Sequence, residues 1–192
     1  MRKFTKKDGR SAADSWTPFY LDEEAKAVNF TAKPLTRLLT TDTGKLFESG
    51  LKNLTEKEDN FIAQMNNLND EELREVTQFG GEDKVLKTWM FSGADFNVAY
   101  AQVQLAADGK TKLFSLGWSN EGLLGQGSEV TESKNFAPMI YETDVHFKDL
   151  YLVETAMYGI TIEGDVWLLG GKRSTPKVDQ SLSPFVTSFE HN

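Results

Sequence analysis

The sequence contains no cysteine, which excludes disulfide bonds and thiolate metal sites and is compatible with a reducing, intracellular compartment. It has no excess of basic charge either, because 21 Lys and Arg stand against 29 Asp and Glu, for a formal net charge of −8. Nucleic acid is therefore not expected as the main ligand. No apolar run approaches the ~20 residues that a helix needs to cross a bilayer, so no membrane span is expected.

Motifs that carry chemistry are scarce as well. The two histidines, His146 and His191, belong to no set of side chains with the spacing of metal ligands, and no serine lies in a nucleophile elbow. The segment closest to a phosphate-binding loop, GGKRST at 170–175, has Arg173 where that motif requires Ser or Thr. The sequence nominates no catalytic residue, no metal ligand and no cofactor, and we expect a protein that is not an enzyme.

Residues 1–15 are predicted to form a basic tail, separate from a folded domain over residues 16–192. The opening MRKFTKKDGR is followed by no apolar segment, so it is not expected to act as a secretory signal. Its basic side chains are either solvated or dock on an acidic protein surface. The candidate contacts in this tail are Arg2, Lys3, Lys6, Lys7 and Arg10.

The folded part contains three similar segments, near residues 35–50, 98–117 and 153–171. In each segment an apolar stretch leads to an acidic residue and a glycine, followed by a second apolar run and another glycine. This pattern predicts three β-hairpins, which recur at a spacing close to the ~50 residues of propeller repeats. The glycines expected at turns are Gly44, Gly50, Gly109, Gly117, Gly122, Gly125, Gly127, Gly164 and Gly170.

Residues 55–76 break the β pattern and are predicted to form a helical insertion. Thr55 and Glu58 fit a capping box, and a second short helix would contain Leu73 and Val76. One apolar helical face would pack either on the adjacent sheet or on a partner, and it consists of Phe61, Ile62 and Met65.

The segment GWSNEGLLGQG at 117–127 resembles the repeat of the regulator of chromosome condensation family. That repeat has the turn G-x-x-N-x-x-G-x-L-G-x-G, matched here by Gly117, Asn120, Gly122, Leu124, Gly125 and Gly127. The resemblance covers roughly residues 16–189, as one strong repeat between two weak ones. It implies a β-propeller, in which we expect the glycine turn to cross from one blade to the next.

The expected fold is mainly all-β: a partial propeller of about three four-stranded blades with a short helical insertion. Closed propellers usually have at least four blades, and an uncovered end blade presents an apolar face or unpaired edge that isolated proteins normally cover. The main hypothesis is therefore a non-enzymatic scaffold subunit in a larger assembly, completed by other protein subunits.

Two other hypotheses stay open. The resemblance implies guanine-nucleotide exchange on a small GTPase, which the family performs with one face of a complete ring. A hydrolytic or transferase enzyme would need converging carboxylates or a His–acid pair, which the sequence does not nominate. Besides the tail and the insertion, a partner would contact the glycine loop through Trp118, Asn120, Glu121 and Leu123. A cytoplasmic or cytoskeletal, including axonemal, location is expected, with mitochondria and nucleus as alternatives.

Overall fold

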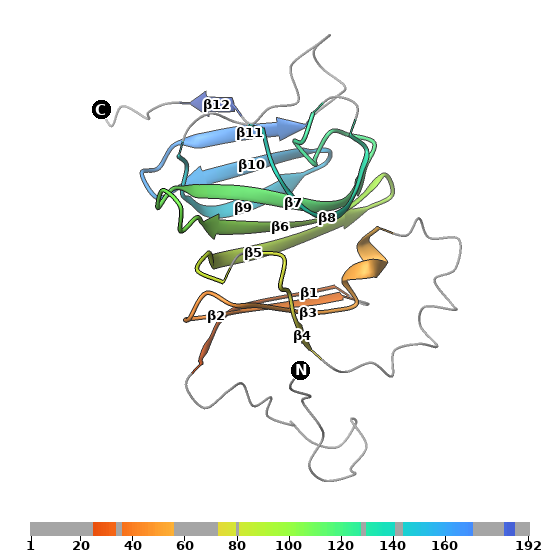
Figure 1. The fold of residues 1–192 in the computed structure, drawn as a ribbon. Helices are drawn as coiled ribbons and strands as arrows, with labels where there is room; N and C mark the ends of the chain where they lie inside the picture. The colour runs from red at the N-terminus through yellow and green to blue at the C-terminus, as the bar shows by residue number, and fades with distance from the viewer. Residues whose placement is uncertain are drawn as a thin grey trace, which may run out of the picture.

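The computed structural model describes residues 25–33, 36–55, 73–79, 81–127, 130–140, 144–170 and 183–186. These residues form three antiparallel sheets of four strands each, stacked in chain order (Figure 1). The fold predicted from the sequence, a partial propeller of three four-stranded blades, is confirmed. One short 3-10 helix, Leu51–Leu54, follows the third strand.

Each sheet is a meander in which consecutive strands pair. The first sheet contains β1 (Ala27–Lys33), β2 (Thr36–Thr41), β3 (Leu46–Ser49) and β4 (Arg74–Glu75). The second contains β5 (Lys84–Gly93), β6 (Phe96–Gln104), β7 (Thr111–Ser119) and β8 (Glu132–Pro138). The third contains β9 (Phe147–Val153), β10 (Ala156–Thr161), β11 (Val166–Gly170) and β12 (Ser183–Val186).

The hairpins expected from the sequence coincide with the two middle strands of each sheet, β2–β3, β6–β7 and β10–β11. Buried and partly buried residues alternate in β10, whereas β6 and β7 are buried over most of their length because the second sheet has a neighbouring sheet on each side. Gly170, expected at a closing turn, is instead the last residue of β11 and pairs with Ala156.

The expected helical insertion differs from the structure at its end. Arg74 and Glu75 form β4, which pairs with β3, and the Val76 amide donates to the Leu46 carbonyl at 2.8 Å. Leu73 is buried, so burial and the free edge of β3 outweigh the helix-forming composition of this stretch. The apolar stripe of Phe61, Ile62 and Met65 lies outside the described residues.

The first strands of successive sheets are neighbours. The Thr88 amide and hydroxyl in β5 both donate to Oδ1 of Asn29 in β1, at 3.0 and 2.8 Å. The Trp89 indole donates to Oδ1 of Asp149 in β9 at 2.7 Å. The strands β1, β5 and β9 therefore lie along one side of the stack, as the first strands of neighbouring propeller blades do.

Two apolar clusters fill the spaces between the sheets. Between the first and second sheets the cluster contains Leu38, Leu46, Leu54, Val85, Met90, Ala99, Ala101, Val103, Leu116 and Phe136. Between the second and third it contains Trp89, Phe96, Val98, Tyr100, Leu113, Leu123, Leu124, Met139, Val145, Phe147, Leu150, Met157 and Trp167. The second sheet is thus apolar on both faces, which is why its strands do not alternate strictly.

Candidate interaction surfaces

The glycine loop connects β7 to β8 within the second sheet. The expectation that it crosses between blades is therefore wrong. The loop folds back on its own sheet: the Ser119 amide donates to the Thr131 carbonyl at 2.9 Å, and the Ile140 amide donates to the Gly125 carbonyl at 2.7 Å. The chain passes from the first sheet to the second after β4 and before β5.

Side chains of the second sheet form hydrogen bonds with the backbone of this loop. The Tyr100 hydroxyl donates to the Leu123 carbonyl at 2.6 Å, and the Ser115 hydroxyl donates to the Leu124 carbonyl at 2.5 Å. Oγ of Ser119 accepts the amides of Glu121 and Leu123. Burial strongly raises the pKa of Tyr100, so its hydroxyl remains a donor. These bonds fix the loop as part of the core.

This arrangement changes the set of candidate contact residues. Trp118 is 8% exposed and Leu123 is fully buried, which removes both from the surface where a partner was expected to meet them. Asn120 is exposed and Glu121 is partly exposed, and these two stay candidates. The candidates in the tail and in the insertion lie outside the described residues.

The remaining expected turn glycines have positive φ angles; they are Gly44, Gly50, Gly109, Gly117, Gly122, Gly125, Gly127 and Gly164. Gly117 carries the tightest requirement. A Cβ at this position would collide with the carbonyl oxygen of Asn97 on the paired strand β6. Because Gly117 has no side chain, its strand, β7, can approach the backbone of β6 closely.

A polar cluster that sequence reasoning missed joins the second and third sheets. The Lys87 ammonium lies 3.3 Å from Oδ1 of Asp149, donates to the Lys148 carbonyl at 2.8 Å, and lies 5.1 Å from the centre of the Trp89 ring. Burial alone would raise the pKa of Asp149, but the Trp89 hydrogen bond, the Lys87 charge and the Leu150 amide together hold it below its ordinary value of 3.8.

Because the folded state lowers this pKa, the Asp149 carboxylate stabilises the fold above pH ~4, and the contribution is lost as the pH falls through the folded-state pKa. We expect Asp149→Asn to lower the urea midpoint at pH 7 and to lower it less at pH 3. Tryptophan fluorescence during urea unfolding measures both. Asp108→Asn, in an exposed turn, is the control and should change the midpoint little. An Asp149→Asn effect of equal size at both pH values would contradict this role.

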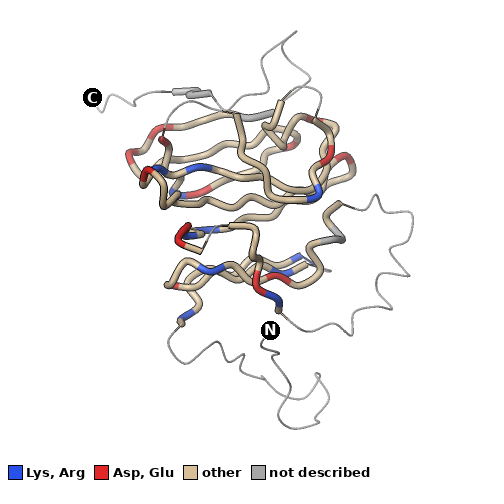
Figure 2. Tube along the Cα trace, in the orientation of Figure 1, with Lys and Arg blue, Asp and Glu red and all other residues tan. Residues whose placement is uncertain are grey.

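The described residues hold no group of three or more His, Asp or Glu side chains placed to bind a metal ion. In the same part of the chain no helix is long and apolar enough to cross a membrane. Figure 2 shows acidic and basic residues interspersed along the described trace. The remaining candidate surfaces are the outward faces of the first and third sheets.

Equivalent positions in the three sheets can be assigned from the first hairpin of each. These hairpins close with the pairs Lys33–Thr36, Gly93–Phe96 and Val153–Ala156, each around two loop residues. We call the side of a sheet that turns toward the next sheet its forward face, and the opposite side its rear face. Directly paired residues share a face.

The rear faces carry the same apolar row in all three sheets. In the second and third sheets the rows are Met90–Ala99–Leu116 and Leu150–Gly159–Trp167, and both lie in the buried clusters. In the first sheet the equivalent row is Phe30–Leu39–Phe47. Phe30 is 57% exposed, whereas Met90 and Leu150 at the same position are each 4% exposed.

The forward faces show a smaller contrast at the other end. The rows Thr31–Leu38–Glu48 and Phe91–Val98–Gly117 contain Leu38 and Val98, both fully buried. The equivalent row of the third sheet is Tyr151–Tyr158–Leu168. Tyr158, at the position of Leu38 and Val98, is partly buried, and Tyr151, whose equivalents in the other rows are also partly buried, is 49% exposed. Val153, nearby in β9, is 57% exposed.

No family model matches the sequence, and no curated protein matches it at a significant level. Solved structures do match. Human WBSCR16 is 15% identical, with a TM-score of 0.57 over 86% of this chain and 40% of that protein. Yeast RCC1 (Prp20), solved bound to Kap60, is 13% identical, with a TM-score of 0.55 over 88% of this chain and 39% of that protein.

The fold is thus that of part of a β-propeller of the regulator of chromosome condensation type, as the glycine loop indicated. The chain spans about two-fifths of the length of both proteins.

Proposed function

We propose that this chain is a non-enzymatic scaffold subunit whose two end faces bind other protein surfaces. The observation that carries the proposal is the exposure of Phe30, whose equivalents Met90 and Leu150 are buried, together with that of Tyr151, whose equivalents Thr31 and Phe91 are partly buried. Exposed apolar side chains grouped on one face mark interaction sites more often than single ones do. Phe30 and Tyr151 therefore mark the exposed parts of the two end faces, whereas Leu39, paired with Phe30, is 7% exposed.

The neighbours support a role in protein contacts, since yeast RCC1 was solved bound to Kap60. They also support the alternative, a regulator of nucleotide exchange on a small GTPase, which remains a proposal because the chain spans only part of those proteins. Stimulated nucleotide release from any member of a GTPase panel would favour that alternative. For the scaffold we propose an intracellular, cytoplasmic or cytoskeletal location.

The scaffold function is tested by purifying the tagged full chain from its native cells and quantifying the co-purifying proteins. We expect Phe30→Asp and Tyr151→Asp each to reduce specific partners at least tenfold, because a buried carboxylate without a counter-charge costs more than ~1.4 kcal/mol, the equivalent of a factor of ten. Ile140→Asp is the matched control, since Ile140 is 55% exposed but lies after β8, away from both rows. An equal loss with the control, or no loss with the end-face variants, would contradict the proposal.

A further inference from the structure

We propose that residues 76–79 protect the outer edge of the second sheet and prevent its last strand, β8, from pairing with β8 of a second copy of this chain. An edge strand presents amides and carbonyls that have no partner in their own sheet, and these groups pair readily with an extended strand of another molecule. The inference is independent of the proposed function, because it concerns the edge of one sheet and not the end faces of the stack.

The side chain of Gln78 takes the place of a neighbouring strand at Phe136. The Phe136 amide donates to Oε1 of Gln78 at 2.9 Å, and Nε2 of Gln78 donates to the Phe136 carbonyl. A glutamine amide has a donor and an acceptor, as a peptide group does. One side chain therefore satisfies the two backbone groups that a paired strand would satisfy.

Phe136 has no such partner within its own sheet. Between the residues that pair with Ser115 and Gly117, β8 contains three residues, 134–136, where β7 contains one. This bulge interrupts the pairing of β7 with β8, and β8 is the last strand of the sheet. The Phe136 amide and carbonyl therefore depend on a group from outside the sheet, and Gln78 supplies it.

The rest of β8 carries further features that oppose pairing with another chain. Pro138 has no amide hydrogen, and the Asn135 carbonyl accepts the Ser133 hydroxyl at 2.8 Å. Lys134 is exposed on the bulge. Prolines, bulges and charged side chains, lysine above all, are the usual protection of edge strands. Gln78 adds the same protection at Phe136, whose amide and carbonyl these features leave open.

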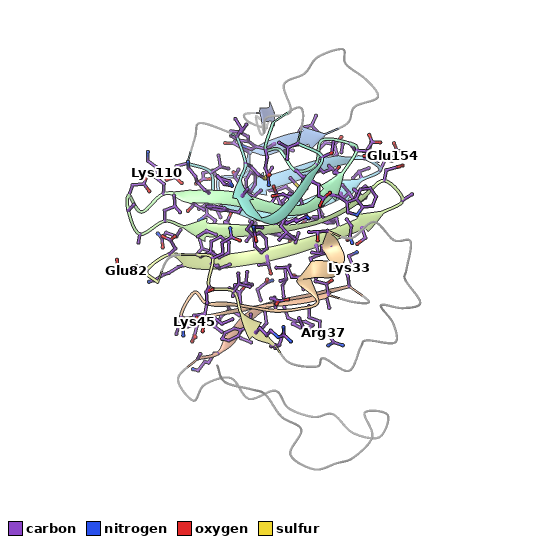
Figure 3. The ribbon with its side chains drawn as sticks, turned by 45° about the vertical axis from the view of Figure 1, so that its right-hand side comes forward. Lys33, Arg37, Lys45, Glu82, Lys110 and Glu154 are labelled. Carbon is purple, nitrogen blue, oxygen red and sulfur yellow. The ribbon has the colours of Figure 1, made fainter. Side chains whose placement is uncertain are left out.

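The first of the protecting residues is anchored beside the first sheet. The Val76 amide donates to the Leu46 carbonyl in β3 at 2.8 Å, and Val76 packs against the apolar cluster between the first and second sheets. Glu75, directly before it in β4, lies 3.5 Å from the ammonium of Lys45, and Figure 3 shows Lys45 at the first sheet. The segment therefore starts from a fixed position.

The last of these residues is anchored to the second sheet. Phe79 is partly buried, and its ring centre lies 5.3 Å from that of Phe114 in β7 and 5.5 Å from that of Phe136 in β8. Because Gln78 directly precedes Phe79, the packing of this ring places the Gln78 amide against the backbone of β8. Gln78 itself is exposed, so its replacement removes no side chain from the apolar core.

The test is Gln78→Ala in the full chain, which removes both hydrogen bonds to Phe136. We expect the average mass from light scattering to rise with concentration to roughly twice that of the unmodified chain, as β8 strands pair. In dilute solution the Phe136 amide should exchange about tenfold faster, the factor equivalent to ~1.4 kcal/mol for a lost hydrogen bond, and it should slow again at high concentration. Gln104→Ala, at an exposed glutamine of β6, is the matched control and should change neither quantity.

Destabilisation alone is a different cause of association, and Gln102→Leu controls for it. This substitution removes an equivalent pair of hydrogen bonds, made to Phe147 in the core, and leaves β8 covered. We expect Gln102→Leu to keep the mass of the unmodified chain. Equal association of Gln102→Leu and Gln78→Ala would overturn the inference.

The inference would also be overturned by a Gln78→Ala chain that keeps the mass of the unmodified chain at every concentration. A Phe136 amide that exchanges at the unmodified rate in dilute Gln78→Ala, or that stays unprotected when the chains associate, would have the same meaning. The proposed function is judged separately, by the partner capture with Phe30→Asp and Tyr151→Asp.

Discussion

Gly117→Ala is expected to destabilise the fold by about 3–5 kcal/mol, a large part of the 5–15 kcal/mol that typically holds a domain together. Two effects add. The φ angle of Gly117 is +120°, which L-residues rarely adopt, and the new Cβ would collide with the Asn97 carbonyl oxygen. That oxygen belongs to the backbone of the adjacent strand β6, so relief requires the β6–β7 pairing to separate. Urea unfolding followed by tryptophan fluorescence measures the loss.

Gly109→Ala separates the two effects. Gly109 also has a positive φ, +71°, but a Cβ there has nothing within 4 Å, so only the backbone strain of about 1–2 kcal/mol remains. Gly81→Ala, at a site with an ordinary φ and open space, should be neutral or slightly stabilising. Similar losses for Gly117→Ala and Gly109→Ala would show that the close approach to β6 contributes nothing.

The hairpins could be predicted from the sequence because their signals are local. Alternating apolar residues around Asp108 and Gly109, for example, specify two strands and a tight turn without reference to the rest of the chain. The sequence was a poorer guide to where one sheet ends and the next begins. The sequence repeat begins in the middle of one sheet, so its glycine loop was assigned to a crossing between blades although it joins β7 to β8. The spacing of a sequence repeat does not by itself determine which strand is the first of a sheet.

Other elements could not be predicted because they depend on contacts between residues distant in the chain. The strand β4 has two residues and exists because β3 offers a free edge. The cluster of Lys87, Trp89 and Asp149 joins residues about sixty positions apart, and nothing in the local sequence around Asp149 indicates its partners. The burial of Trp118, which is 8% exposed, is likewise not indicated by the loop motif alone.

Gln102→Leu is expected to destabilise the fold by about 2–4 kcal/mol, because one amide side chain satisfies two buried backbone groups. Gln102 is 1% exposed in β6, in the second sheet, and Phe147 is 1% exposed in β9, in the third. The Phe147 amide donates to Oε1 of Gln102 at 2.7 Å, and Nε2 of Gln102 donates to the Phe147 carbonyl at 3.2 Å. Leucine fills a similar volume but leaves both groups without a partner, at about 1–3 kcal/mol each.

The matched control is Gln104→Leu, the same substitution two positions further along β6. Gln104 is exposed, and its amide makes one long contact of 3.4 Å with the Gly109 carbonyl, so a change within about 0.5 kcal/mol is expected. Urea midpoints and native-state hydrogen exchange at the Phe147 amide distinguish the two variants, since only Gln102→Leu frees that amide. A stable Gln102→Leu variant with a protected Phe147 amide would contradict this role of the Gln102 side chain.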